Sequence, residues 1–399
     1  MSLGIVFNKM KKLKVRLSTP TVNNREINSL KKIFNNSWLG YGPNVIKFEK
    51  MWSRYFKVKH SVGVNSCTAA LHLSLAVNNF KKNKKVLVPA MTFSSSAASI
   101  LYCGLKPVFV DIDPKTLVMS FEDLKKKYSK DCVALIAVHF NGQPCEMEKI
   151  VPWAKKNKLT VIEDCAQTCG GDYKGKKLGT WGDFGCFSFQ EIKIMTTGGD
   201  GGMISTNKTK YIKELKALSY HGWDQDPWDR HKKSLINKKK IKHWNYSITK
   251  LGFKYNMTDL MASIGLVQLK KLSNFNKSRE RIIKSYISSL KDFKNLKPAF
   301  PYKFNKSSYW MFAINCPKRD NLINYLKLKG ISTTVYIKPL PLHPLYRKYK
   351  DNISNSLRIW KNLVTLPTYP NMSKSQLQYV IKHLKIFDKK YLQAGINLK

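Results

Sequence analysis

The sequence predicts an α/β protein in which a large part with a mostly parallel sheet precedes a smaller α+β part. Three observations lead to this class. Between residues 60 and 205, short runs rich in Val and Ile alternate with segments of helical length, which is typical of parallel strands joined by helices. A long helical pattern begins near Tyr255, and shorter strands and an amphipathic helix follow it. The 399 residues, 43% of them hydrophobic, suffice for two or three domains.

The expected elements of the first part alternate along the chain. The expected strands are Val62–Val64, Lys85–Val88, Pro107–Val110, Ala134–Val138 and Thr160–Ile162. The helical stretches expected after them are Thr68–Val77, Ser94–Tyr102, Phe121–Tyr128, Met147–Lys156 and Cys165–Thr168. Ligands of such sheets bind beyond the carboxyl ends of the strands, so the residues directly after each strand are the first candidates for chemistry.

The second part is expected to hinge on a long helix. Its apolar pattern runs through Leu260, Ile264, Val267 and Leu272 into Ile282–Leu290. The elements expected after it are strands at Met311–Asn315 and Thr333–Tyr336 and a helix at Lys374–Phe387. We therefore place an N-terminal arm and the large domain in residues 1–255, and the long helix and the small domain in residues 256–399. The stretch 223–250 lacks clear periodicity, and we expect a long surface loop there.

The composition excludes several classes of protein. The longest apolar runs, such as Ala134–Val138, fall far short of the roughly 20 residues that span a bilayer. The N-terminus places a short apolar stretch before its charges, the reverse of a secretory signal. The eight Cys include no CxxC pair, so we expect no metal site and no disulfide framework. We expect a cytoplasmic protein with reduced thiols and no membrane partner.

The charge is unusual, because 71 Lys and Arg face 25 Asp and Glu, a formal net charge of +46. One interpretation is a polyanionic partner, since basic fields concentrate phosphate-bearing ligands. The other is that lysines have accumulated on solvated faces. Readers of base edges favour Arg, and only nine of the 71 basic residues are Arg. We therefore favour solvated lysines and expect no nucleic-acid partner, although the field would help to recruit a phosphorylated substrate.

Two post-strand segments combine small residues with polar ones. Residues 65–69 (NSCTA) end a strand and start a helix, where exposed backbone N–H groups can hold a phosphate. A Ser or Thr at a helix start is, however, most often a simple N-cap. Residues 161–167 (VIEDCAQ) deliver a carboxylate, Asp164, at a strand end, with an amide, Gln167, three residues later. Taken alone, Asp164 is slightly better explained as a helix cap.

A third segment is harder to explain by a purely structural role such as capping. Lys193 lies between an aromatic strand, residues 185–189, and a turn dense in glycine, residues 198–202. Most lysines are solvated, but catalytic amines need partial burial that lowers their pKa, and glycines let the backbone approach a ligand closely. A fourth segment, residues 89–94, places the ring of Phe93 at the same sheet edge, although a core position is the commoner explanation of a single Phe.

Together these segments resemble the DegT/DnrJ/StrS family of nucleotide-sugar aminotransferases, which depend on pyridoxal phosphate and have fold type I. The strings that carry the resemblance are EDCAQ (163–167), GCFSFQEIK (185–193) and TTGGDGGMI (196–204). Similar flanking phrases are SWLGYGP (37–43), HFNGQP (139–144), YNMTD (255–259), GLVQL (265–269), PLHPLYR (341–347) and LP (366–367). The resemblance extends from about residue 18 to residue 387, and ordered motifs at consistent separations make it specific.

The resemblance implies a role for each matching residue. Lys193 would form the Schiff base with pyridoxal phosphate and then shuttle the proton between cofactor and substrate. Asp164 would pair with the pyridine nitrogen and keep the ring protonated as an electron sink. Gln167 would donate a hydrogen bond to the 3-oxygen of the ring, and Phe93 would stack on its face.

The phosphate contacts implied by the resemblance come from two subunits. Cys67, Thr68 and Ser188 would hold the phosphate of their own subunit's cofactor. Asn256 would reach the phosphate in the neighbouring subunit, so the expected assembly is a homodimer with composite active sites. The stretch 221–250 is the other expected contributor across the dimer.

Some positions depart from the usual pattern of the family. Gln190 stands where relatives often carry His, Cys67 where they carry Gly or Ala, and Asp200 where Glu is commoner. None of these removes the mechanism. A dehydratase branch replaces the lysine by His, so the presence of Lys193 favours transamination.

Other functions stay open at this point. Cysteine desulfurases and dehydratases share the fold and the cofactor, but a desulfurase needs a mobile Cys in the second part, and Cys316 at the end of an expected strand suits a core position better. A nucleic-acid-binding regulator on an inactive fold would carry an added domain, for which residues 1–18 are too short. A sensor or scaffold without catalysis conflicts with an intact set of Lys193, Asp164 and Ser188.

The resemblance also implies the substrates. L-Glutamate would donate the amino group to a keto carbon, preferably C4, of a nucleotide-linked deoxysugar in the synthesis of surface polysaccharides or related amino sugars. Trp38, Tyr336 and His343 are candidates for the sugar pocket. Indole rings and cations in residues 221–233 suit a nucleoside diphosphate, although packing at a dimer interface explains them equally well. UDP, dTDP and GDP remain equal alternatives.

Overall fold

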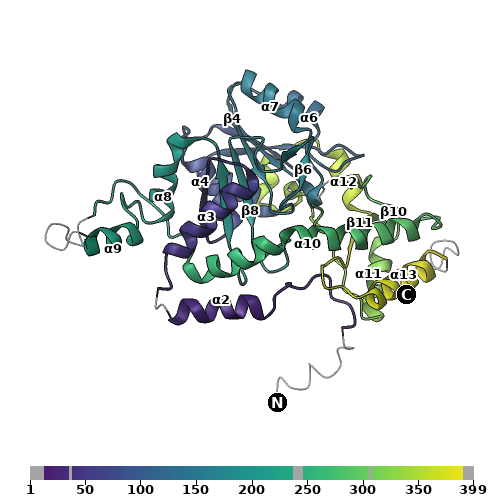
Figure 1. The fold of residues 1–399 in the computed structure, drawn as a ribbon. Coiled ribbons are helices and arrows are strands. Elements are labelled where there is room, and N and C mark those ends of the chain that lie inside the picture. Colours follow the sequence, from purple (N-terminus) through teal and green to yellow (C-terminus); the bar gives the residue numbers. More distant parts are fainter. Residues whose placement is uncertain (1–12, 36–37, 237–245, 305–307, 390–399) are drawn as a thin grey trace, which may run out of the picture.

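A computed structural model of the chain describes residues 13–35, 38–236, 246–304 and 308–389. A seven-stranded sheet forms its centre (Figure 1). The strands, in spatial order, are β1 (His60–Val64), β9 (Gly202–Thr206), β8 (Phe184–Ser188), β5 (Thr160–Asp164), β4 (Cys132–Val138), β2 (Lys85–Pro89) and β3 (Lys106–Val110). All neighbours pair in parallel except β9, which is antiparallel to β8 and to β1. The predicted mostly parallel sheet is therefore confirmed.

Helices cover both faces of this sheet because its strands are apolar on both sides. Val88 and Ile136 point to the face covered by α4 (Cys67–Ala76), α5 (Ser94–Tyr102) and α8 (Ile212–Ser219). Leu87 and Leu135 point to the other face, where α6 (Phe121–Lys127) and α7 (Met147–Lys156) lie. Next to them, Phe187 packs on Trp52 of α3 (Pro43–Phe56). Helices packed on both faces hold the strands in place, and this fixes the positions of the residues that follow each strand.

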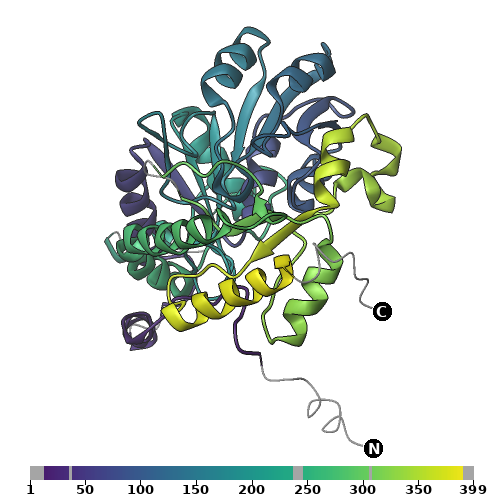
Figure 2. The same cartoon turned by 90° about the vertical axis from the view of Figure 1, so that its right-hand side faces the viewer.

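The second part is built on α10 (Asp259–Leu290), which confirms the predicted long helix. Its antiparallel sheet has the order β10 (Lys297–Pro298), β11 (Phe312–Asn315) and β12 (Leu363–Leu366). α11 (Arg319–Leu328) and α13 (Lys374–Phe387) pack side by side on it (Figure 2). α13 begins with a capping box between Ser373 and Gln376, which explains why its start was predictable.

The remaining elements are short or join the two parts. They are α2 (Asn24–Asn35), which packs on α10, the hairpin β6 (Asp172–Tyr173) and β7 (Lys176–Lys177), α9 (Pro227–Ile236), α12 (Ser354–Trp360), and 3-10 helices at Phe140–Gly142, Thr209–Tyr211, Leu340–Leu342 and Pro344–Tyr349. None of the helices in the described residues is both long and apolar enough to cross a bilayer. The eight cysteines are free thiols.

Three of the expected elements were wrong. Thr333–Tyr336 makes one isolated bridge instead of a strand, because Ile337 takes a left-handed conformation (φ 62°) that ends the extended run. Cys165–Thr168 is a tight turn, closed by a hydrogen bond from Thr168 N–H to Cys165 O. The stretch 223–250 contains the helix α9, whose start is capped by Asp226. Residues 237–245 of that stretch lie outside the described residues.

Candidate active site

A cavity of about 370 Å³ lies at the carboxyl ends of β1, β2, β5 and β8. The loops after these strands line it, and two aromatic residues of the second part close one wall. The polar and aromatic residues of its lining are Ser66, Cys67, Thr68, Phe93, Ser95, Asp164, Gln167, Ser188, Gln190, Lys193, Asp200, Trp310 and Tyr336. The structure thus brings together seven residues that the sequence analysis singled out for the cofactor or for catalysis: Cys67, Thr68, Phe93, Asp164, Gln167, Ser188 and Lys193.

Lys193 projects into this cavity from a tight turn after β8. Its N–H donates to Gln190 O at 2.8 Å, and its carbonyl accepts a hydrogen bond of 3.4 Å from the buried guanidinium of Arg279. The side-chain nitrogen lies 3.7 Å from the centre of the Trp310 indole ring. Burial lowers the pKa of Lys193 to about 8, although the negative charge of Asp164 acts in the opposite direction. Part of the amine is therefore neutral near pH 7, as a nucleophile requires.

Asp164 lies at the end of β5 with 4% of its surface exposed. Ser96 Oγ donates to its Oδ2 at 2.7 Å, and Ala166 N–H donates to Oδ1 at 3.0 Å. Burial raises the pKa of Asp164, while these hydrogen bonds and the charge of Lys193 lower it. No described residue forms an ion pair with this carboxylate, so a cationic group in the cavity would meet an uncompensated buried charge.

Gln167 follows in the turn after β5 and is 2% exposed. Its side-chain oxygen accepts a hydrogen bond from the backbone N–H of Asn141. This contact leaves the NH₂ group as the part of the amide that can serve a ligand in the cavity. The orientation suits the predicted donation to a ring oxygen.

The first turn of α4 forms the end of the cavity that suits an anion. Ser66 caps the helix by accepting from Ala69 N–H, and Cys67 and Thr68 are its first two residues. The Thr68 and Ser95 hydroxyl oxygens lie 2.8 Å apart. Helix N-termini attract anions through their N–H groups and dipole. Burial raises the pKa of the Cys67 thiol, which therefore stays neutral beside such an anion.

The close approach of backbone to this helix end explains the glycine-dense turn. A Cβ at Gly202 would lie 2.5 Å from the carbonyl carbon and oxygen of Ser66. Gly201 adopts φ +143°, where a side chain would also collide with Thr197. Side chains at these two positions would therefore push the start of β9 away from the first turn of α4.

Two aromatic rings stand at the mouth and the wall of the cavity. Phe93 is 58% exposed, which leaves its face free for stacking. The Tyr336 ring lies 4.8 Å from that of Trp310. Its hydroxyl is buried and has no hydrogen-bond partner among the described residues. Burial raises the pKa of Tyr336 well above its usual range. The hydroxyl is therefore neutral and can donate a hydrogen bond to a ligand in the cavity.

Three predicted residues do not line this cavity. The Trp38 indole donates to Tyr41 O and packs against the Trp228 ring of α9 at 4.9 Å. His343 lies between two 3-10 helices, and Asn256 is buried beside the end of β1, where its amide donates to Met257 O. Their roles in the sugar pocket and across a dimer remain predictions.

Two residues that are distant in the sequence contact the Lys193 turn and were not predicted. Trp310 lies 117 positions along the chain, and its indole N–H donates to Ile192 O at 2.6 Å. Arg279 of α10 donates to Trp310 O and Thr368 O, both at 2.6 Å, and so ties the second part to the lysine turn. An Arg inside an apolar helical pattern was the only signal for Arg279. Ser96, in the Ser94–Ser96 run after Phe93, was within reach of motif analysis.

Glu163, the neighbour of Asp164, is the centre of a buried hydrogen-bond network. The side-chain Nε2 of His139 lies 3.0 Å from Glu163, which also accepts the N–H groups of Gly179, Trp181 and Gly182. The other ring nitrogen of His139 accepts Cys145 N–H. His139, Glu163 and Cys165 lie close enough to hold a metal ion, but these hydrogen bonds use both His139 nitrogens and both Glu163 oxygens. The residues therefore serve to hold the strand ends in place.

The side chains of the cavity fit pyridoxal phosphate group by group. The amine of Lys193 suits its aldehyde, the unpaired carboxylate of Asp164 its protonated ring nitrogen, and the start of α4 its phosphate. The exposed ring of Phe93 and the NH₂ of Gln167 suit the face and the 3-oxygen of the pyridine ring. The cavity volume of about 370 Å³ lies within the range of small-molecule sites.

Comparison with known proteins identifies the family that the sequence motifs resemble. Residues 20–385 match the model of the DegT/DnrJ/EryC1/StrS aminotransferase family. The chain is 33% identical to the spore coat polysaccharide biosynthesis protein SpsC of Bacillus subtilis, covering 92% of this chain and 95% of that one. It is 32% identical to GDP-perosamine synthase of Escherichia coli O157:H7, covering 92% and 97%.

Solved structures agree in fold. The PLP-form of Spr1654 from Streptococcus pneumoniae is 27% identical and superposes with a TM-score of 0.84, covering 94% of this chain and 98% of that chain. The predicted resemblance and the fold type I architecture are thus confirmed. Its sequence, its fold and its lysine site together place this chain in the DegT/DnrJ/EryC1/StrS aminotransferase family.

Proposed function

We propose that this protein moves an amino group from L-glutamate to C4 of a nucleotide-linked keto sugar. As a member of its family, the chain is a pyridoxal-phosphate-dependent aminotransferase that acts on sugars. The observation that carries the proposal is that the partly neutral amine of Lys193 and the unpaired carboxylate of Asp164 share one cavity.

Lys193 is the group that binds the cofactor and moves the proton. With a pKa of about 8, its amine can both accept and release a proton near neutral pH. When bound, pyridoxal phosphate supplies an electron sink for the negative charge that develops on the substrate carbon. Asp164 keeps that sink effective by holding a positive charge on the ring nitrogen. Trp310 and Tyr336 shield the amine from water on the side of the second part.

The sugar substrate is supported by two relatives. One is named GDP-perosamine synthase and the other a protein of spore coat polysaccharide biosynthesis, so we assign this chain to the synthesis of an amino sugar for a surface polysaccharide. The unpartnered hydroxyl of Tyr336 is the best-placed donor for a sugar oxygen. Trp38 and His343 are proposed to complete the sugar pocket.

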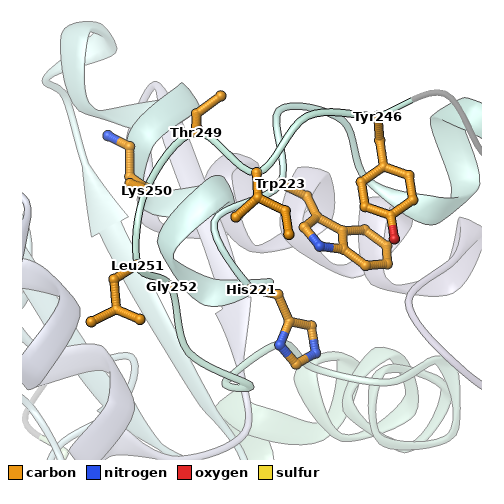
Figure 3. A pocket seen from close by; sticks show the side chains of 8 residues that line it. His221, Trp223, Tyr246, Thr249, Lys250, Leu251 and Gly252 are labelled. Carbon is orange, nitrogen blue, oxygen red and sulfur yellow. The ribbon is translucent and has the colours of Figure 1, made fainter.

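The described surface also supports a homodimer with composite active sites. A groove of about 720 Å³ is lined by residues His221, Trp223, Tyr246, Ile248, Thr249, Lys250, Leu251 and Gly252 (Figure 3). Leu251 is 89% exposed and Ile248 is 69% exposed, and adjacent exposed apolar side chains of this kind suit contact with a second copy. We assign this groove and Asn256 to the contact across the dimer.

The two enzyme alternatives of the same fold are less well supported. A desulfurase needs a mobile cysteine, but Cys316 is fully buried directly after β11. A dehydratase of this family would lack the lysine that is present at position 193.

A panel of nucleotide-linked 4-keto-6-deoxy sugars, incubated with cofactor and L-glutamate, tests the proposal. Mass spectrometry should find one sugar converted to an amino sugar, with 2-oxoglutarate formed in equal amount. If no nucleotide sugar is aminated while a simple keto acid turns over well, the substrate proposal fails although the cofactor assignment stands. Replacing glutamate by aspartate or alanine is the matched control for the donor.

A further inference from the structure

The edge of the large sheet that lies opposite the active site has a distinct composition. The amino ends of six strands meet there, together with the carboxyl end of the antiparallel β9. The segments at this edge, which we call the basic edge, are residues 57–60, 81–85, 104–106, 129–132, 155–160, 181–184 and 206–210. Seven strands about 4.8 Å apart give it a length of about 30 Å.

These segments form one continuous surface. Hydrogen bonds and ion pairs join neighbouring segments: Lys59 N–H to Asn207 at 2.9 Å, Lys208 to Asp183 at 3.2 Å, Lys84 to Asp131 at 2.9 Å, and Lys106 N–H to Lys84 O at 2.9 Å. The segment 155–160 lies between the two groups, because Thr160 pairs with Ala134 and the N–H of Val161 donates to Asp183 at 2.9 Å. The side chains of the basic edge therefore share one face of the molecule.

The basic edge carries thirteen lysines and two carboxylates. The lysines are Lys57, Lys59, Lys81, Lys82, Lys84, Lys85, Lys106, Lys130, Lys155, Lys156, Lys158, Lys208 and Lys210. Eleven of them are exposed, and Lys84 and Lys85 are half-buried. Both carboxylates, Asp131 and Asp183, already pair with lysines of the same edge. The face is therefore a dense positive field without free acidic groups.

The active-site edge of the same sheet has the opposite balance. Its segments, residues 65–67, 90–93, 111–115, 139–143, 164–168, 189–193 and 198–201, hold two lysines, Lys115 and Lys193, and five carboxylates, Asp111, Asp113, Asp164, Glu191 and Asp200. The active-site edge is mostly buried, but exposure alone does not explain the difference, because eleven of the sixteen exposed residues of the basic edge are lysines. This concentration of lysines at one edge of the sheet points to a function of the basic edge.

The sequence alone favours solvated lysines and no membrane partner, but on the distribution of lysine in the fold we propose that the basic edge docks the protein on a lipid surface with anionic headgroups. None of the nine arginines lies in these segments, and compact, hydrated ammonium groups suit diffuse attraction to lipid phosphates rather than forked contacts. The active-site cavity lies at the opposite end of the strands and would stay open to solvent.

Sedimentation with lipid vesicles tests this proposal on the full-length protein. Vesicles of phosphatidylglycerol and phosphatidylcholine in equal parts should bind it at about 0.05 M salt, and salt at about 0.5 M should release it because the interaction is screened. Vesicles of phosphatidylcholine alone should not bind. Equal binding to both kinds of vesicle, or no binding to either, would overturn the proposal.

Two variants with the same change in charge separate this face from net charge. The edge variant replaces Lys57, Lys59, Lys81, Lys82, Lys106 and Lys158 by Gln, and the control variant replaces Lys270, Lys277, Lys291, Lys327, Lys374 and Lys382 by Gln, all of them exposed. The edge variant should bind at least about 100-fold more weakly, with unchanged turnover of soluble substrate, and the control should bind nearly as well as the wild type. Equal losses in the two variants, or tighter binding of the wild type to a random-sequence DNA duplex than to the vesicles, would refute a lipid-docking face.

Discussion

The side-chain amine of Lys193 lies against the face of Trp310, 3.7 Å from the centre of the indole ring. The two residues come from different parts of the chain, and Arg279 holds the backbone carbonyls of both. A positive charge over an indole face is stabilised by the ring quadrupole, while burial disfavours that charge. Together with the negative charge of Asp164, these two effects set how much of the lysine is neutral, and therefore how well it can act as a nucleophile and as a base.

The titration of Lys193 should reflect this balance in the cofactor-free protein. Only the neutral amine reacts with an amine-directed reagent, so modification should fall about tenfold per pH unit below a midpoint near 8. Mass spectrometry of the peptide that contains residue 193, measured across pH, gives the midpoint. A midpoint near 10.5, the ordinary value of a lysine side chain, would show that burial does not act on this group.

Replacement of Trp310 should move that midpoint downwards. Trp310→Leu keeps an apolar wall but removes the ring face that stabilises the ammonium form, so the pKa of Lys193 should fall by about 0.5 to 1 unit. Trp310→Phe retains a ring face and serves as the control, with a smaller shift. A higher midpoint in the Leu variant would mean that the indole does not stabilise the charged form.

Replacement of Asp164 tests the partner of the cofactor's ring nitrogen. Asp164→Asn should bind pyridoxal phosphate more weakly and lower turnover by at least about 100-fold, because an amide cannot stabilise a protonated pyridine. Ser96→Ala, which removes the 2.7 Å hydrogen bond to the same carboxylate, should give a much smaller loss. Cofactor titration by absorbance and steady-state rates provide both measurements. Activity of Asp164→Asn within a few-fold of the wild type would refute the assignment.

Mixed dimers test the composite active site. Lys193→Ala and Asn256→Ala should each be nearly inactive alone, the second through a weakened phosphate contact. When the two are unfolded together and refolded, one site of each mixed dimer would contain both intact groups, so part of the activity should return. An active monomer, detected by light scattering, would refute composite active sites. Mixtures that are no more active than their components would refute them as well.

The sequence allowed much of the sheet to be predicted, because its strands are short apolar runs bounded by polar turns. The helix α5 was predicted to the residue and β2 to within one residue. Motifs likewise placed Lys193, Asp164 and Gln167 together, since each follows a strand and the strand ends meet at one edge. Strand β9 was not foreseen, because it follows the glycine-dense turn and joins the sheet in the reverse direction.

The contributions of the second part were beyond the sequence analysis for a physical reason. Trp310 and Arg279 reach the lysine through packing between distant segments, which leaves no local periodicity. Tyr336 was named as a substrate residue while its segment was expected to be a strand. The structure instead shows an irregular segment held by one bridge between Thr334 and Thr365, and this path is what brings the Tyr336 ring to Trp310.

The position of the covalent bond to the cofactor decides whether Lys193 carries pyridoxal phosphate. The purified protein with its cofactor should be reduced with borohydride, digested and mapped by mass spectrometry, with Lys193→Ala treated in parallel. We expect one pyridoxyl group per chain, located on Lys193, and none in the variant, whose turnover should be lost by several orders of magnitude. A label on another lysine, or no label on a protein that still transfers amino groups, would contradict it.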